Sequence, residues 1–328
     1  MNAGIDIGYK ATKIATSSQH KMFQSIVGTL DESSFKTSGV EATSLVIGDS
    51  AYFIGRAADE QSRFASRGQE TRNWIETTDY DVLIKASLGW LHEQYPDEDE
   101  YTVVTGLPVS YFRRDAEKLK AKFLGAHSAV YNGEEYHVSV VNARVIPQPF
   151  GTLFSYVFDR NGVVNEKHAK LAMTKVGVLD IGSHTTNMQV IIRGDDLAKE
   201  STSIAVGGWK LVQAVKERLG ELMPELEPSD HAVAAALEGE RLMYYGEEID
   251  IRSVAAPFAS DIANSIKAQV AATWGTAADL YAILVTGGGA HLIGEYLKFP
   301  QSWIVPDPVF ANVQGYSNFA QRVARMGQ

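Results

Sequence analysis

Apolar residues along the chain follow two spacings that predict alternating strands and helices. Residues 101–105 and 281–285 are short apolar-rich runs, and residues 136–146 alternate between apolar and polar over much of their length. A continuous apolar run is typical of a strand covered on both faces, whereas alternation is typical of a strand with one face in solvent. Gly106 and Gly287 follow the first two runs closely and are expected to end those strands.

Helical spacing recurs between these strands. Apolar residues stand three or four positions apart in three segments, which predicts amphipathic helices packed on a core at residues 80–95, 209–219 and 258–270. A charged helix is predicted over residues 116–123 with Gly125 as its C-cap, and Pro257 is expected in the first turn of the third helix. Polar segments predict loops at residues 31–39, 96–100 and 159–170.

The most informative pattern is a repeat. Residues 4–12 and residues 178–186 share one order: an apolar residue, Asp, Ile and Gly, then three residues and Thr. Each copy is followed by residues typical of a returning strand, so each predicts a β-hairpin with a tight glycine turn. Because the copies lie half a chain apart, we expect a duplicated architecture in which one hairpin opens each half.

Composition narrows the class of protein. The 328 residues correspond to about two domains. A content of 45% hydrophobic and 21% charged residues is ordinary for a globular protein and argues against disorder of the bulk. The net charge of −10 argues against a protein that coats nucleic acid. The lack of cysteine excludes disulfides, thiolate metal sites and a Cys nucleophile. With no legible signal peptide or membrane span, we expect a cytoplasmic protein.

The repeated turns are candidates for binding phosphate and a metal ion. A glycine turn between strands directs backbone N–H groups at an anion, and the Asp before it stands at the end of the strand. Two such carboxylates, Asp6 and Asp180, could hold Mg²⁺ through water, because Mg²⁺ keeps several waters and takes few protein ligands. Further glycines stand at residues 286–290 after a buried strand, and at Gly207 and Gly208 before a helix, where free N–H groups are expected.

Other common chemical signatures are absent from the sequence. It contains neither a Walker A motif nor a G-x-G-x-x-G dinucleotide fingerprint. The eight histidines show no metal-binding spacing, and no nucleophile-elbow motif for Ser–His–Asp catalysis is present.

The combination of motifs resembles the actin superfamily over nearly the whole chain. The two phosphate-loop motifs match residues 6–13 and 180–186, the first connecting motif matches Gln148 and its neighbours, and the adenosine motif matches residues 284–290. Within the superfamily, the segment TGLP at residues 105–108 and the segment DPVFANVQGY at residues 307–316 resemble those of the ParM/StbA-type bacterial and archaeal actin-like proteins.

The resemblance implies a fold and domain boundaries. It implies an α/β actin-like fold of two duplicated ribonuclease-H-like domains, with a nucleotide cleft between them and small inserted subdomains. The expected domains are residues 1–150, completed by a C-terminal helix at about 315–328, and residues 151–314. Insertions are expected at about 24–100 and 212–251, where residues 242–251 resemble a hairpin, and each domain is expected to contain a mixed five-stranded sheet.

The resemblance also implies roles for single residues. Asp6 and Asp180 would hold Mg²⁺ through water. The phosphates would be lined by Gly8, Tyr9, Lys10, Gly182, Ser183 and His184. The nucleoside would be framed by Gly207, Gly208, Gly287, Gly288 and Gly289. Lys13 would either reach a phosphate or pair on the surface, and Lys210 and Glu238 would either contact ribose or adenine or pair on the surface.

Gln148 is the candidate for orienting the attacking water. A carboxamide is not a strong base, but it can accept one hydrogen bond from water, as a Gln does in some GTPases. Two prolines flank Gln148 and predict a stiff turn after a strand that ends at Ile146. ParM-like proteins often carry Glu here, and many relatives carry Asp at the position of Asn187, so the chain departs from part of the family at both places.

The function implied is a nucleotide-dependent, filament-forming actin-like ATPase. It would use ATP, or alternatively GTP, with Mg²⁺, and would segregate plasmid or other DNA through a ParR-like DNA-binding adaptor. Its partners would be other copies of itself and the adaptor, with no direct contact to DNA or membrane. The alternatives are a sugar or small-metabolite kinase on the same fold, which needs a catalytic Asp, and a cytoskeletal scaffold or chaperone-like relative.

Overall fold

The computed structural model describes residues 1–29, 43–62, 64–67 and 73–326, and the predicted loop at 31–39 lies outside them. The chain forms two compact units, residues 1–169 with 312–328, and residues 170–311. These units differ from the predicted domains, because a boundary at residue 150 would fall within helix α4 (Gln148–Val157). No helix among the described residues is both long and apolar enough to cross a membrane.

The first unit contains a ten-stranded sheet in the order β3-β2-β1-β8-β10-β9-β5-β6-β4-β7. Its strands are β1 (Asn2–Ile7), β2 (Ala11–Ala15), β3 (His20–Gln24), β4 (Ile26–Thr29), β5 (Ser44–Ile47), β6 (Ser50–Ile54), β7 (Ala65–Arg67), β8 (Glu100–Leu107), β9 (Gly125–Tyr131) and β10 (Glu134–Pro147). The predicted hairpin at residues 4–12 is the antiparallel pair β1–β2, and β8 and β10 continue the sheet in parallel.

The prediction of five strands is wrong for this unit because β10 is long enough to belong to two parts of the sheet. Its C-terminal half pairs in parallel with β8, and its N-terminal half pairs antiparallel with β9. The pairing register with β8 shifts between Val140 and Asn142, which marks a bulge. The sheet continues through β9 into the four strands between residues 26 and 67.

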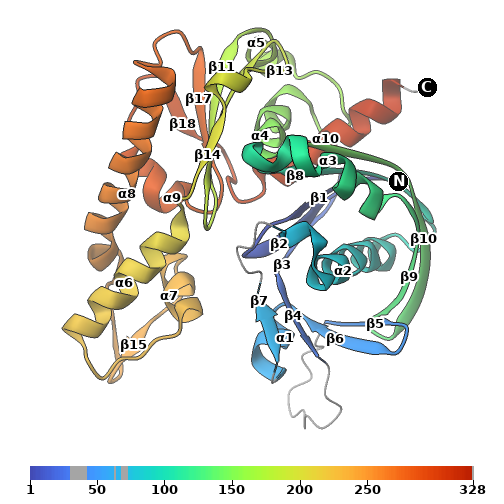
Figure 1. The fold of residues 1–328 in the computed structure, drawn as a ribbon, viewed down its shortest axis with the longest axis horizontal. Coiled ribbons are helices and arrows are strands. Elements are labelled where there is room, and N and C mark those ends of the chain that lie inside the picture. The colour runs from blue at the N-terminus through green and yellow to red at the C-terminus, as the bar shows by residue number, and fades with distance from the viewer. Residues whose placement is uncertain (30–42, 63, 68–72, 327–328) are drawn as a thin grey trace. The chain divides into compact units, whose positions relative to one another are not determined.

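Successive side chains of β1 point to opposite faces of this sheet, and helices cover both faces. Ala3, Ile5 and Ile7 lie in the core that also contains α2, whereas Gly4 contacts the backbone of α10. Figure 1 shows α2 lying within the curve of the sheet. The helices are α1 (Arg56–Gln61), η1 (Trp74–Glu76), α2 (Thr78–Gln94), α3 (Val109–Phe123), α4 (Gln148–Val157), η2 (Glu166–His168), α5 (Ala169–Met173) at the boundary, and α10 (Ala311–Met326).

Two local predictions in this unit need correction. Helix α3 begins seven residues before the predicted 116–123, and its C-cap is Leu124 in an extended conformation. Gly125, with φ of +104°, is instead the first residue of β9. The predicted loop at 159–170 contains η2 and the start of α5.

The second unit repeats the strand order of the first around the second hairpin. Strands β11 (Lys175–Ile181) and β12 (Thr186–Ile192) form the antiparallel hairpin, and β17 (Ala282–Thr286) and β18 (Ser302–Ile304) extend it in parallel. At the other edge, β13 (Asp195–Asp196) and β14 (Thr202–Ile204) both pair with β12, which makes six strands where five were predicted. A separate hairpin of β15 (Met243–Tyr244) and β16 (Glu247–Glu248) confirms the hairpin predicted within 242–251.

Helices α6 (Gly208–Leu222), α7 (Asp230–Leu237) and α8 (Ile251–Trp274) pack with this sheet into one core, and α9 (Ala290–Ile293), η3 (Ala198–Glu200) and η4 (Gly294–Tyr296) are short. Pro257 lies inside α8 and not in its first turn. The helix begins at Ile251 because the Asp250 side chain accepts from the N–H of Ser253 and caps it there. The predicted position of Pro257 is therefore wrong, because the cap stands upstream of it.

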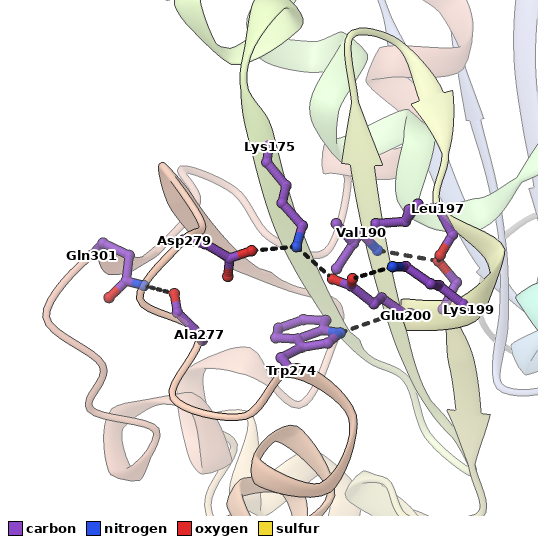
Figure 2. A network of polar contacts seen from close by, with 10 residues as sticks. Lys175, Val190, Leu197, Lys199, Glu200, Trp274, Ala277, Asp279 and Gln301 are labelled. Carbon is purple, nitrogen blue, oxygen red and sulfur yellow. Dashed lines mark hydrogen bonds and ion pairs between the residues drawn. The ribbon is translucent and has the colours of Figure 1, made fainter.

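A polar network fastens the end of this sheet that lies away from Asp180. Figure 2 shows Lys175, the first residue of β11, between two carboxylates. Its Nζ lies 2.7 Å from Glu200 Oε2 and 2.5 Å from Asp279 Oδ2. The indole of Trp274, the last residue of α8, donates to Glu200 O at 2.8 Å. The start of β11, the end of α8 and η3 are thereby held together.

Candidate functional site

The first hairpin turn has the tight form that its glycine predicts. Gly8 N–H donates to Ala11 O at 3.1 Å, and Ile7 pairs with Thr12 where the strands meet. Thr12 Oγ1 lies 3.0 Å from Ser25 Oγ in a buried position, which fixes β2 to the residue that joins β3 and β4. Tyr9 and Lys10 occupy the tip of this turn, as expected of residues proposed to line phosphates.

Asp6 gathers two other predicted residues around its carboxylate. It is only 4% exposed at the end of β1. Gln148 Nε2 donates to Asp6 Oδ1 at 3.2 Å, across 142 positions of sequence. Lys13, opposite Asp6 on β2, places Nζ 3.7 Å from Asp6 Oδ2, with its side chain 18% exposed. Lys13 thus pairs within the site and not on the open surface, and its contact with phosphate stays a prediction.

Gln148 is the first residue of helix α4, so the predicted turn between two prolines is wrong. Strand β10 runs through Pro147 and the helix begins at once, with Pro149 in its first turn where a missing N–H costs nothing. Tyr316 Oη donates to Gln148 O at 3.3 Å. A Cβ on Gly106 would overlap the Tyr316 hydroxyl and lie 3.0 Å from Gln148 Cγ. Glycine in the TGLP segment therefore makes room for both side chains.

Helix α10 holds α4 in place, which gives the C-terminal motif a physical role. Asn312 Oδ1 accepts from Thr152 N at 3.1 Å and from Thr152 Oγ1 at 2.7 Å, all buried. At the crossing, a Cβ on Gly315 would overlap Gly151 O. In the sequence, this motif indicated only a resemblance to a protein family. The structure shows that its Asn, Gly and Tyr fix the helix that carries Gln148.

Two aromatic residues beside this hairpin, Trp74 and Tyr80, were not predicted as site residues. The rings of Tyr9 and Trp74 lie 5.8 Å apart, and the rings of Trp74 and Tyr80 lie 5.7 Å apart edge to face. Burial raises the pKa of Tyr80, and the negative charge of Asp6 raises it further, so Tyr80 stays a neutral phenol near that carboxylate. Trp74 has no periodic signal in the sequence, and only the fold places it beside the turn.

The second hairpin repeats the turn with different neighbours. Gly182 N–H donates to Thr185 O at 2.8 Å, and Ile181 pairs with Thr186. Asp180 is 6% exposed and faces Asn187 on β12. Asn187 is buried and accepts from Ser203 Oγ at 2.7 Å. An amide thus stands where the first hairpin has the ammonium group of Lys13.

The N–H groups at the start of α6 donate to the second turn, so they are not the free N–H groups that were predicted. The N–H of Gly208 donates to Gly182 O at 3.0 Å, and that of Trp209 donates to Ser183 O at 2.6 Å. A Cβ on Gly207 would lie 2.6 Å from both of these carbonyl oxygens. The two glycines are needed so that the helix can approach the turn, and a contact with the nucleoside stays a prediction.

Side chains of the second turn are packed against that helix. His184 Nδ1 lies 2.8 Å from Ser183 Oγ, and the His184 ring stacks on Trp209 with centroids 5.5 Å apart. Lys210 is exposed on α6, and Glu238, the C-cap of α7, is exposed as well. The contacts of Lys210 and Glu238 with ribose or adenine therefore stay predictions.

The glycines after β17 differ in what surrounds them. Gly287 has φ of +89°, and its N–H donates to Pro308 O at 3.0 Å. A Cβ there would lie 2.5 Å from Asp180 Oδ1. Gly289 N–H donates to Ile181 O at 2.9 Å, whereas a Cβ on Gly288 would have no heavy atom within 4 Å. Gly287 therefore leaves room for Asp180, Gly288 is the open one of the three, and their contact with a nucleoside stays a prediction.

The predicted residues thus form two groups, each within one unit. Lys13 and Gln148 each contact Asp6 beside the first turn, and Asp180 lies against Gly287 beside the second. Among the described residues no three His, Asp or Glu side chains form a metal-binding group. Single buried carboxylates suit Mg²⁺, which uses one or two of them together with water and phosphate oxygens.

Two family models match the chain. The model described as actin like proteins N terminal domain matches residues 4–151, and the model described as archaeal actin homologue MreB-like, C-terminal, matches residues 178–299. Together they cover more than half of the chain, and each begins within a hairpin strand that precedes a glycine turn. The chain belongs to the actin-like proteins.

Solved structures of actin-like proteins share the fold over the whole length. The archaeal actin homolog Ta0583 in complex with ADP is 19% identical with a TM-score of 0.78, over 98% of this chain and 99% of that one. A 15-stranded ParM filament from Clostridium botulinum is 19% identical with a TM-score of 0.79, over 98% and 99%. Bacillus thuringiensis ParM with ATP is 14% identical with a TM-score of 0.75, over 99% and 98%. No curated protein matches the chain by sequence.

Proposed function

We propose that this actin-like protein is a nucleotide-dependent, filament-forming ATPase. The observation that carries the proposal is the contact of Gln148 with Asp6 at the end of a strand whose hairpin recurs in the second unit. A matched pair of Asp–Gly turns with one water-orienting amide suits hydrolysis of a phosphoanhydride. The ADP bound to Ta0583 and the ATP bound to Bacillus thuringiensis ParM support a purine nucleotide as the ligand.

Each turn would bind phosphate oxygens through backbone N–H groups. The turns at residues 8–11 and 182–185 have the same hydrogen bond from glycine to the third following residue, so the two backbone turns are alike. Backbone N–H groups of such a turn can bind an anion through their dipoles. ATP would be preferred by analogy with the relatives, with GTP as the alternative.

Asp6 and Asp180 would hold Mg²⁺ through its bound waters. When bound, the ion would neutralise charge on the phosphate oxygens. The residues of the chain would do the rest of the positioning. Lys13 offsets part of the Asp6 charge from 3.7 Å, and Gly287 keeps the space next to Asp180 Oδ1 clear. The two carboxylates therefore have unequal surroundings for the same task.

Gln148 would orient the attacking water. Because its Nε2 donates to Asp6, the carboxamide is held with Oε1 as the atom that accepts from a water O–H. The Tyr316 hydroxyl on its backbone and the contact of α4 with α10 fix the start of the helix. No proton moves to the amide in this step, and its contribution is orientation alone.

Assembly and segregation are the finer parts of the proposal. The ParM filament of Clostridium botulinum shares the fold, which supports self-association as the working state. Filament growth would segregate plasmid or other DNA through a ParR-like adaptor. The net charge of −10 supports contact with DNA through a basic partner, because direct binding to phosphates needs Lys and Arg.

The test follows phosphate release and light scattering in one sample of the purified protein with ATP and Mg²⁺. We expect both signals to rise above a critical protein concentration, and an analogue that cannot be hydrolysed to support scattering alone. Gln94→Ala, a change at a glutamine at the end of α2 whose amide donates to its neighbour Glu93, serves as a control with normal signals. A protein that stays monomeric and instead phosphorylates an added sugar would be a kinase, which overturns the proposal.

A further inference from the structure

Two buried tryptophans of this chain differ in the state of their indole N–H groups. Trp74 and Trp274 are each 7% exposed. Trp274 donates to Glu200 O at 2.8 Å, as Figure 2 shows. No described residue accepts the N–H of Trp74. A buried donor without an acceptor is rare and costly, so such a group calls for a reason.

The surroundings of Trp74 point to the first turn. Its ring lies 5.8 Å from the ring of Tyr9, at the tip of the turn between Gly8 and Ala11. Its ring also lies 5.7 Å from the ring of Tyr80, in the first turn of α2, in an edge-to-face arrangement. The indole therefore packs against residues of both the turn and that helix.

The backbone of Trp74 is fixed independently of the turn. Its carbonyl accepts from Thr77 Oγ1 at 2.8 Å, and Thr77 also caps α2 by accepting from Tyr80 N–H. Glu76, in the same short helix, pairs with Lys118 of α3 at 2.5 Å. No acceptor for the indole N–H is found among residues 1–29, 43–62, 64–67 and 73–326, and the turn that carries Tyr9 is the adjoining described element proposed to bind a ligand.

We propose that Trp74 is a positioning residue for the first turn: when phosphate binds, the turn presents an oxygen acceptor to the indole N–H, and this hydrogen bond strengthens binding of ATP. The proposal rests on the proposed function, because it takes the turn to be a phosphate site. It goes further in naming a residue outside the family motifs and a contact that forms only with ligand. An indole N–H that no described residue accepts then becomes a source of affinity.

The test is the indole proton spectrum of the whole protein. The five tryptophans give five indole signals, and that of Trp74 is assigned by its loss in Trp74→Phe. We expect saturating ATP to move the Trp74 signal downfield and slow its exchange with solvent. Adenosine, which has no phosphate, should leave it in place. The Trp274 signal, already hydrogen-bonded, serves as the internal control and should not change with either ligand.

Affinity gives the second measurement. Trp74→Phe, and replacement of Trp74 by 3-benzothienylalanine, which keeps the ring shape but has sulfur in place of the N–H, should weaken ATP binding about five- to tenfold. Binding of adenosine should stay unchanged. Trp274→Phe should lower the melting temperature and leave ATP affinity as in the parent.

The outcomes separate the two proposals. If ATP binds but neither the Trp74 signal nor the affinity of the 3-benzothienylalanine variant changes, the role of Trp74 is wrong and the ATPase proposal stands. An equal loss of affinity for adenosine and ATP would assign Trp74 a purely structural role and overturn the inference. If the parent protein binds no ATP, both proposals fall.

Discussion

In the first hairpin Asp6 faces Lys13 across the strand pair, whereas in the second Asp180 faces Asn187. The turns that follow are alike, since Gly8 and Gly182 make the same hydrogen bond. A cation 3.7 Å from a buried carboxylate offsets part of its charge, and a neutral amide does not. Duplication thus preserved the backbone of the two sites while their side chains diverged. We infer that Asp6, besides its proposed part in cation binding, also organises Lys13 and Gln148.

Removing each carboxylate should have the largest effect and should separate these roles. We expect Asp180→Ala and Asp6→Ala each to slow Mg²⁺-dependent ATP hydrolysis by on the order of 10³-fold, because a fixed charge at the reacting phosphate is lost. Asp6→Ala should also lower the melting temperature more, because it leaves Lys13 with its side chain largely buried and without its ion-pair partner.

A double variant checks this difference. Asp6→Ala combined with Lys13→Met should recover the melting temperature without recovering hydrolysis. Equal melting temperatures for the two single variants would remove the distinction between the hairpins. Hydrolysis at the parent rate in either variant would mean that the carboxylates are not part of the reaction site.

Gln148 lies in the first unit and contacts Asp6, so changing Gln148 tests the first hairpin in this comparison. Gln148→Ala should slow hydrolysis ~10²-fold, about 2.7 kcal/mol of barrier, through loss of one orienting hydrogen bond. ATP affinity should stay within a few fold, and filaments should form and persist longer. Gln148→Glu, which restores the residue common among ParM-like relatives, should keep or raise the rate. Phosphate release and scattering measure both effects, and loss of ATP binding in Gln148→Ala would reveal a structural role instead.

Gly287 and Gly288, neighbouring glycines of the second unit, give a matched pair of variants. Gly287→Ala should destabilise the protein by about 1–3 kcal/mol and weaken nucleotide binding, because φ is +89° and the new Cβ would press on Asp180 Oδ1. Gly288→Ala should change stability by less than about 0.5 kcal/mol, because its Cβ meets no atom within 4 Å. Thermal unfolding with and without ATP tests the pair. Equal effects would show that the glycines share one role.

The smallest effect is expected at the far end of the second sheet. Lys175→Met should lower stability by roughly 1 kcal/mol, because Glu200 is largely buried while Asp279 is mostly exposed and screened by water. The hydrogen bond from Lys175 lowers the pKa of Asp279 below its ordinary 3.8. The stability that the Lys175–Asp279 ion pair contributes is present above about pH 4 and is lost as the pH falls further. The melting-temperature gap between parent and variant should therefore be smaller at pH 3 than at pH 7, and a gap that widens would contradict this account.

Local pattern was enough to predict the elements that carry the site. The repeat around Asp6 and Asp180 predicted both hairpins, and the apolar stripes predicted α2, α6 and most of α8. These features depend on neighbouring residues, whose spacing the sequence displays directly. The position of Pro257 was misread because the cap at Asp250 stands outside the apolar stripe.

Contacts between distant residues could not be predicted in the same way. The hydrogen bond from Gln148 to Asp6 joins residues 142 positions apart, and the space that Gly287 leaves for Asp180 depends on two strands meeting. Trp74 has no motif and becomes a candidate only when the fold brings Tyr9 to it. Free N–H groups at α6 were expected because a glycine pair before a helix does not reveal that the turn at 182–185 already uses them.

The contact of α10 with β1 and α4 has a consequence for how the chain is made. Gly4 lies against the backbone at Val313, and Gly151 against Gly315, so the first unit is closed by residues that are synthesised after the whole second unit. The second unit, residues 170–311, is continuous in sequence and can complete its core earlier in synthesis. The order of folding would thus reverse the order of the units along the chain. Until residues 312–326 are synthesised, the helix that bears Gln148 lacks its partner, so a chain truncated before Asn312 should leave that helix loosely packed.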